Sequence, residues 1–126
     1  MKTFLISALL VGVAASAPMS AHHGSAAFDV GKRLELKGTV TEWVWGNPHC
    51  WLKFDVKDAS GKVVNWVAET TNSADMTEKG WSKRTFKAGD PVTVTLEPVK
   101  SGQPVGRVQF VVLANGQTLG LNYVER

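Results

Sequence analysis

The sequence predicts a mainly β domain, a small OB-like five-stranded barrel with one short helix between its third and fourth strands. Two observations lead to this prediction. Apolar and polar residues alternate with a period of two in five stretches, as expected for strands that bury one face. The segment between the third and fourth stretches carries helix-capping residues instead. An open β-sandwich is the alternative, because a single sequence does not reveal which strands pair.

The first strand is expected over residues 33–45, which alternate between apolar and polar side chains. The residues on its inward face are predicted to be Leu34, Leu36, Val40 and Val44. Gly38 falls on the same face, where a glycine is typical of a sharp bend or bulge in a barrel strand. The turn Gly46-Asn47-Pro48 then ends the strand.

The second and third strands are expected over residues 50–57 and 63–69, joined by a hairpin turn at residues 58–61. The second strand is predicted to direct inward Cys50, Leu52, Phe54 and Val56. Cys50 is the only cysteine, so no intramolecular disulfide can form. We expect it to be a small buried side chain.

A short helix is expected next, since residues 71–73 offer N-cap side chains, residues 74–79 suit one or two turns, and Gly80 suits the C-terminal cap. Two further strands follow the turn at residues 89–91 and the loop at residues 101–104. They are indicated by Val92, Val94 and Leu96, and then by Val108, Phe110 and Val112. The dipeptide Asn115-Gly116 predicts a hairpin turn into a tail strand over residues 118–124.

Residues 1–21 have the layout of a cleavable secretory signal peptide, which predicts a periplasmic protein. A basic start precedes a continuous apolar run over residues 4–15 and then small residues. This run is shorter than the roughly 20 residues that cross a bilayer, and no later segment suits a membrane span. Cleavage after Ala21 is favoured over cleavage after Ala17, which would leave Pro18 next to the cut. Residues 22–126 are then expected to form one domain.

The charge of the mature chain argues against a nucleic-acid partner. The sequence has 14 Lys and Arg and 11 Asp and Glu residues, so removing Lys2 with the signal leaves 13 against 11, a net charge of +2. The two signs are interleaved along the chain, whereas a nucleic-acid surface gathers basic residues into a patch.

The three histidines of the sequence are His22, His23 and His49. Cleavage after Ala21 would give His22 a free α-amine, which can chelate a metal together with the imidazole Nδ1. His49, which follows the Asn47-Pro48 turn, is the expected third nitrogen donor, and His23 is an alternative ligand or a neighbour of the ligands. A flat site of three nitrogens suits Cu(II), with zinc as the second choice. The sequence therefore predicts a metal-binding or metal-handling protein.

Tryptophans suggest a second role. Trp43 and Trp45 alternate with the predicted inward face of the first strand, and Trp51 lies opposite Leu52. If all three indoles face outward around the turn before His49, they form an aromatic platform for a small ligand or a partner. Slippage of the first strand's register, or cover from other elements, would instead bury them.

Groups for catalysis are sparse. Glu42, Asp55 and Glu69 fall on strand faces at positions where charged residues are usually solvated, and no spacing pairs them. The sequence has no glycine-rich phosphate loop and no nucleophile elbow. These observations favour a binding protein over an enzyme.

Several short motifs are spread over nearly the whole mature domain. They are Ala21-His22-His23-Gly24-Ser25, Leu36-Lys37-Gly38-Thr39-Val40, Trp45-Gly46-Asn47-Pro48-His49, Gly80-Trp81 and Gly89-Asp90-Pro91-Val92. With these motifs the chain resembles a family of small exported bacterial proteins that is known only as a domain of unknown function. The resemblance implies an exported, OB-like protein and keeps the three histidines together as a candidate set. It implies no activity.

Overall fold

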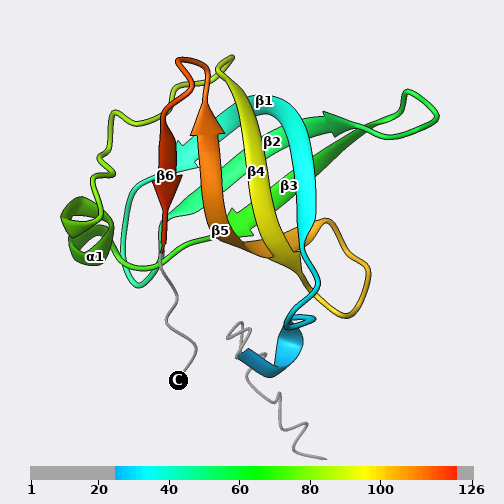
Figure 1. Cartoon of the computed structure of the whole chain (residues 1–126), viewed down its shortest axis with the longest axis horizontal. Coiled ribbons are helices and arrows are strands. Elements are labelled where there is room, and N and C mark those ends of the chain that lie inside the picture. Colours follow the sequence, from blue (N-terminus) through cyan, green and yellow to red (C-terminus); the bar gives the residue numbers. More distant parts are fainter. Residues whose placement is uncertain (1–24, 122–126) are drawn as a thin grey trace, which may run out of the picture.

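In the computed structural model, which describes residues 25–121, all five predicted barrel strands are present. The elements are a 3-10 turn η1 (Ser25–Ala27), β1 (Leu34–Val44), β2 (Trp51–Lys57), β3 (Val63–Glu69), α1 (Ser73–Glu78), β4 (Pro91–Pro98), β5 (Val105–Leu113) and β6 (Thr118–Gly120) (Figure 1). The predicted signal peptide and the candidate ligands His22 and His23 lie outside the described residues.

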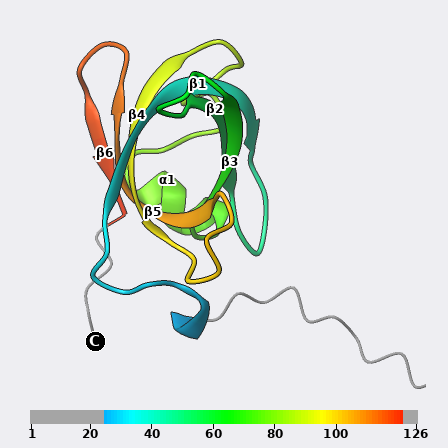
Figure 2. The same cartoon turned by 90° about the vertical axis from the view of Figure 1, so that its right-hand side faces the viewer.

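The strands close into a barrel. Antiparallel pairing gives the order β3-β2-β1-β4-β5, and a parallel contact between residues 67–69 of β3 and residues 105–107 of β5 joins the two ends. Figure 2 shows the closed ring of strands end-on. The short β6 is added to the free edge of β5. The OB-like barrel with a helix between β3 and β4 is therefore confirmed, and the open sandwich is wrong.

The core fills the barrel and continues beneath α1. On β2, Leu52 and Phe54 are fully buried while their neighbours are partly exposed, as the alternation predicts. Seen along the barrel in Figure 2, α1 lies across the far end. Met76 on this helix and Trp81 just after it are buried in the same cluster as the barrel residues. Cys50 is also fully buried and is a free thiol, as expected.

A bulge in β1 reverses the faces predicted for its last residues. Val40 pairs with Phe54 but Glu42 pairs with Lys53, so one extra residue lies between them. Beyond that point Trp43, not Val44, lies opposite the buried Leu52. The inward position predicted for Val44 is therefore wrong, because a single inserted residue exchanges the two faces of a strand.

β5 contains a second bulge with the same effect. Thr95 pairs with Phe110 and Leu96 pairs with Val108, which leaves Gln109 as the extra residue. Val108 is buried, and the next fully buried residue is Val111. Phe110 and Val112, which indicated this strand together with Val108, are both partly exposed.

Gly38 marks a tight point in β1, as predicted. A Cβ at this position would collide with the backbone carbonyl of Asp55 on β2. Only a glycine lets the two strands approach so closely.

The predicted hairpin turn and helix ends are confirmed. At the turn, the Asp58 carboxylate accepts hydrogen bonds from the side chain and backbone of Ser60 and from the backbone of Lys62. These bonds hold the pKa of Asp58 below its usual value of 3.8, and the bond from the Ser60 hydroxyl has the largest effect. Asn72 caps α1 by accepting from the backbone of Asp75, and Gly80 follows the helix at a φ of 88°.

Within residues 25–121 there is no helix with the length and apolar character of a membrane span.

Candidate metal centre

The turn that carries His49 is fixed to the segment between β3 and α1. The Asn47–Pro48 peptide bond is cis, and the Asn47 side-chain oxygen accepts hydrogen bonds from the backbone N and the hydroxyl of Ser73, each at 3.1 Å. The Cys50 backbone N donates to the Thr71 carbonyl at 2.8 Å, and the Thr70 backbone N donates back to the Cys50 carbonyl at 3.0 Å. Hydrogen bonds therefore hold both sides of His49.

The His49 ring has one nitrogen facing acceptors. Nδ1 lies 2.8 Å from the Thr70 carbonyl oxygen and 3.1 Å from Oε1 of Glu69. A carbonyl oxygen can only accept, so Nδ1 carries the proton and Nε2 of the neutral ring has a free lone pair. Among the described residues Nε2 has no hydrogen-bond partner, and 35% of the side chain is exposed. The His49 side chain is therefore partly open to solvent.

A row of charged side chains runs from Glu69 across the outer face of the barrel. We call Glu69, Arg107 and Glu97 the outer charged row. Glu69 on β3 pairs in register with Arg107 on β5, which pairs with Glu97 on β4. The Arg107 guanidinium lies 3.3 Å from the Glu97 carboxylate. Both glutamates are largely shielded, with 13% and 9% of their side chains exposed.

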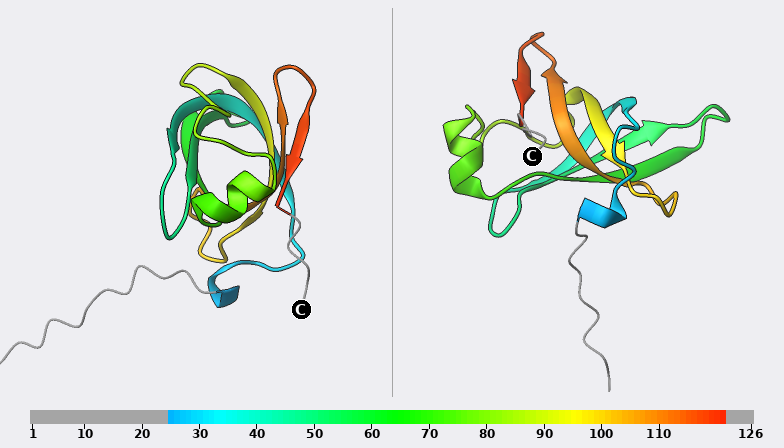
Figure 3. Two further views of the ribbon diagram at one scale, coloured as in Figure 1. Left: turned by 90° about the vertical axis from the view of Figure 1, so that its left-hand side faces the viewer. Right: turned by 60° about the horizontal axis from the view of Figure 1, so that its bottom comes forward.

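The chain leading into β1 docks against this row. The Lys100 backbone N donates to the Ala27 carbonyl at 2.9 Å, and the Asp29 backbone N donates to the Pro98 carbonyl at 2.8 Å. Phe28 between them is only 3% exposed, and the Arg107 guanidinium lies 5.0 Å from its ring centre. Figure 3 shows η1 beside the loop between β4 and β5. The lead is thus fixed one strand away from Glu69.

The structure contains one of the three predicted metal ligands, His49, within the described residues. Its nearest acidic neighbour is Glu69, and Cys50, next in sequence, is buried in the core. Residues 25–121 hold no group of three or more His, Cys, Asp and Glu side chains arranged for a metal.

The three candidate tryptophans do not form a common platform. Trp43 packs against Trp45, Trp81 and Phe86 with ring centres 5.8, 6.1 and 5.2 Å apart, and its indole N donates to the Ser82 carbonyl at 3.0 Å. Both Trp43 and Trp45 are partly buried against the core. Of the two alternatives left open by the sequence, the structure supports burial, because of the β1 bulge and the cover from the segment after α1. Trp51 remains beside the His49 ring, with centres 6.0 Å apart.

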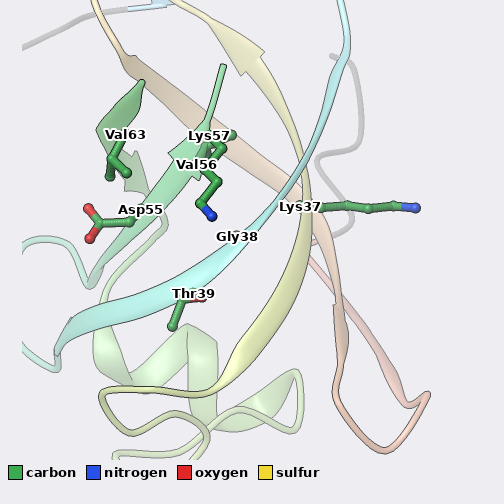
Figure 4. Close-up of a pocket in the computed structure, with 7 residues that line it drawn as sticks. All are labelled: Lys37, Gly38, Thr39, Asp55, Val56, Lys57 and Val63. Carbon is green, nitrogen blue, oxygen red and sulfur yellow. The ribbon is translucent and has the colours of Figure 1, made fainter. Parts of the chain in front are cut away.

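A hollow of about 570 Å³ lies elsewhere, where β1 passes the β2–β3 hairpin. Its lining residues are Lys37, Gly38, Thr39, Asp55, Val56, Lys57 and Val63. Figure 4 shows Lys57 extending toward Gly38, while Lys37 points away from the other side chains. The sequence did not indicate this hollow, and it shares no lining residue with the His49 site.

The contact between Glu69 and His49 was also missed, although the sequence holds a signal for it. A hairpin turn at residues 58–61 pairs Lys57 with Val63, and continuing that register pairs Trp51 with Glu69. His49 lies two residues before Trp51. Counting along the hairpin therefore brings Glu69 near His49, whereas treating each carboxylate separately suggested a solvated side chain.

A search of the curated proteins gave no match to this chain. One family model does match, over residues 9–108, which is most of the sequence. The match confirms the resemblance drawn from the His-His and Asn-Pro-His motifs. The chain belongs to DUF6152, a family of unknown function.

Proposed function

We propose that this protein is an exported, periplasmic metal-binding or metal-handling protein that binds Cu(II) through His22, His23 and His49. The observation that carries the proposal is the orientation of the His49 ring, whose Nδ1 faces the Thr70 carbonyl at 2.8 Å. Metal-binding histidines commonly donate one ring N–H to a carbonyl or a carboxylate and bind the metal through the other nitrogen. Nε2 of His49 is available for that bond.

The donor types also favour copper. Imidazole nitrogens suit Cu(II) and Zn(II), and a flat arrangement of nitrogens favours Cu(II). If export ends with cleavage after Ala21, His22 provides an amine and an imidazole in one residue. An α-amine has a pKa of about 8, so a metal displaces its proton at modest cost near neutral pH.

The docked lead supports convergence of the histidines. Phe28 contacts Arg107, Arg107 pairs in register with Glu69, and Glu69 contacts His49. Neighbouring strands lie about 4.8 Å apart. Five residues lie between His22 and Phe28, and three of them, Ser25–Ala27, form η1, where the chain rises by only about 2 Å per residue. Docking of Phe28 therefore limits the chain that must bring His22 to the His49 ring to the few residues before it.

The test uses the mature protein with its N-terminal residue determined by mass spectrometry. Calorimetry near neutral pH is expected to show one equivalent of Cu(II) bound, and weaker binding by His49→Ala. A matched control retains Met19, Ser20 and Ala21 ahead of His22, which moves the free α-amine away from both histidines and changes no residue of the barrel. Absence of Cu(II) and Zn(II) binding by protein that begins at His22 would rule the proposal out.

A further inference from the structure

We infer that Glu69 is a positioning residue of this metal site and acts on the metal through the His49 ring; the inference rests on the proposed function. Its Oε1 lies 3.1 Å from Nδ1 of His49. The Glu69 side chain is only 13% exposed, whereas that of His49 is 35% exposed. The carboxylate therefore supports the ring from its shielded side.

The geometry favours an indirect role over direct ligation. The two nitrogens of an imidazole direct their bonds away from each other, so a cation at Nε2 lies on the far side of the ring from Glu69. The Thr70 carbonyl accepts from Nδ1 and fixes both the tautomer and the direction of the Nε2 lone pair, and the Glu69 carboxylate lies 3.1 Å from the same nitrogen. Its negative charge also stabilises the positive charge that a bound metal places on the ring.

Glu97 provides a matched control within the same fold. It is the same residue type on the same outer charged row, with 9% of its side chain exposed. Its carboxylate faces Arg107 at 3.3 Å and makes no contact with His49. A change at Glu97 therefore tests loss of a shielded charge without loss of support for the ring.

The experiment measures Cu(II) affinity of the mature protein by competition with a chromophoric chelator. Removing a carboxylate that supports a metal-binding histidine typically weakens binding by about 10- to 100-fold. We expect such a loss in Glu69→Gln, which keeps the shape of the side chain but not its charge. Glu69→Asp, which keeps the charge, is expected to recover part of the affinity. Glu97→Gln is expected to lower the free energy of unfolding and to weaken Cu(II) binding clearly less than Glu69→Gln does.

The outcomes separate this inference from the proposed function. Tight Cu(II) binding by the wild type with an equal affinity in Glu69→Gln would overturn the role of Glu69 and leave the metal site standing. An equal loss in Glu69→Gln and Glu97→Gln would also overturn it, because the effect would then come from the net charge of the row. No binding by the wild type would remove the proposed function and this inference together. Circular dichroism of the metal-free variants establishes that each is folded.

Discussion

Phe28 is the residue through which the docked lead can be tested without touching any proposed ligand. Its side chain is 3% exposed, and the Arg107 guanidinium lies 5.0 Å from the centre of the phenyl ring. We predict that Phe28→Ala releases the lead from the outer charged row. Under the proposed function Cu(II) affinity should then fall, because the docked lead no longer limits the length of chain between the terminal histidines and His49.

The size of the effect follows from the burial of one aromatic side chain. Burying a phenylalanine contributes about 1.5–3 kcal/mol, and 1.4 kcal/mol corresponds to a factor of ten in an equilibrium constant. The docking equilibrium of the lead should therefore shift by about 10- to 100-fold. The apparent Cu(II) affinity falls in proportion to the docked fraction of the protein. The 10- to 100-fold shift is therefore the largest loss of affinity expected.

Two measurements on the same protein check this prediction. Amide hydrogen exchange reports docking directly, since the backbone N of Asp29 donates to Pro98 and that of Lys100 donates to Ala27. The control is Val30→Ala, a change in the same lead at a side chain that is 60% exposed, which should alter neither exchange nor affinity. Loss of protection at both amides with an unchanged Cu(II) affinity would refute the role of the lead.

Three further predictions concern the barrel. Gly38→Ala should lower the free energy of unfolding by about 1–3 kcal/mol in urea titrations, because the Cβ of the new alanine would meet a backbone carbonyl. Gly46→Ala is the control and should have little effect, since a Cβ at that position meets nothing within 4 Å. Trp43→Ala should lower the free energy of unfolding by about 3 kcal/mol. Trp51→Ala should lower it clearly less, since of these two rings only that of Trp43 packs against the core. The folded chain lowers the pKa of Asp58 below 3.8, so its carboxylate adds stability that is present above that pH. The advantage of the wild type over Asp58→Asn should shrink as the pH falls below about 4.

Each of these three predictions has a result that would contradict it. Equal stability of the two glycine variants would mean that β1 and β2 can separate at Gly38. A larger cost for Trp51→Ala than for Trp43→Ala would contradict the bulge in β1. A pH-independent difference between the wild type and Asp58→Asn would contradict the hydrogen bonds at the hairpin turn.

Local patterns in the sequence predicted most of the fold. The alternation in β2, the turn at residues 58–61 and the capping by Asn72 and Gly80 each depend on neighbouring residues, and all are confirmed. Closure of the barrel was predicted from the order of the elements. Its physical cause, the parallel contact between β3 and β5, joins distant segments and leaves no local signal.

The bulges explain where the prediction of faces failed. Each inserts one residue, after Val40 in β1 and at Gln109 in β5, and the alternation before it cannot indicate where the phase changes. Gly38 pointed to an irregular strand, but the register shifts only after Val40. The consequence for function is direct, because this shift places Trp43 in contact with the core and not on an aromatic surface platform.

The candidate site was predicted in part. His49 was identified from its place after the Asn47-Pro48 turn, and the hydrogen bonds of that turn explain why such a motif suits a fixed imidazole. Glu69 was treated as a solvated carboxylate, because its contact with His49 depends on the pairing of two strands. Phe28 gave no signal, since its burial depends on Arg107, far along the chain.

The most direct test of the central claim is pulsed EPR of the mature protein loaded with one equivalent of Cu(II), which detects the remote nitrogens of coordinated imidazoles. The wild-type spectrum should contain one more imidazole than the spectrum of His49→Ala. The remote nitrogen of that additional ring should be the protonated Nδ1 that faces Thr70 and Glu69. Identical spectra for the wild type and His49→Ala would contradict the claim that His49 binds the metal.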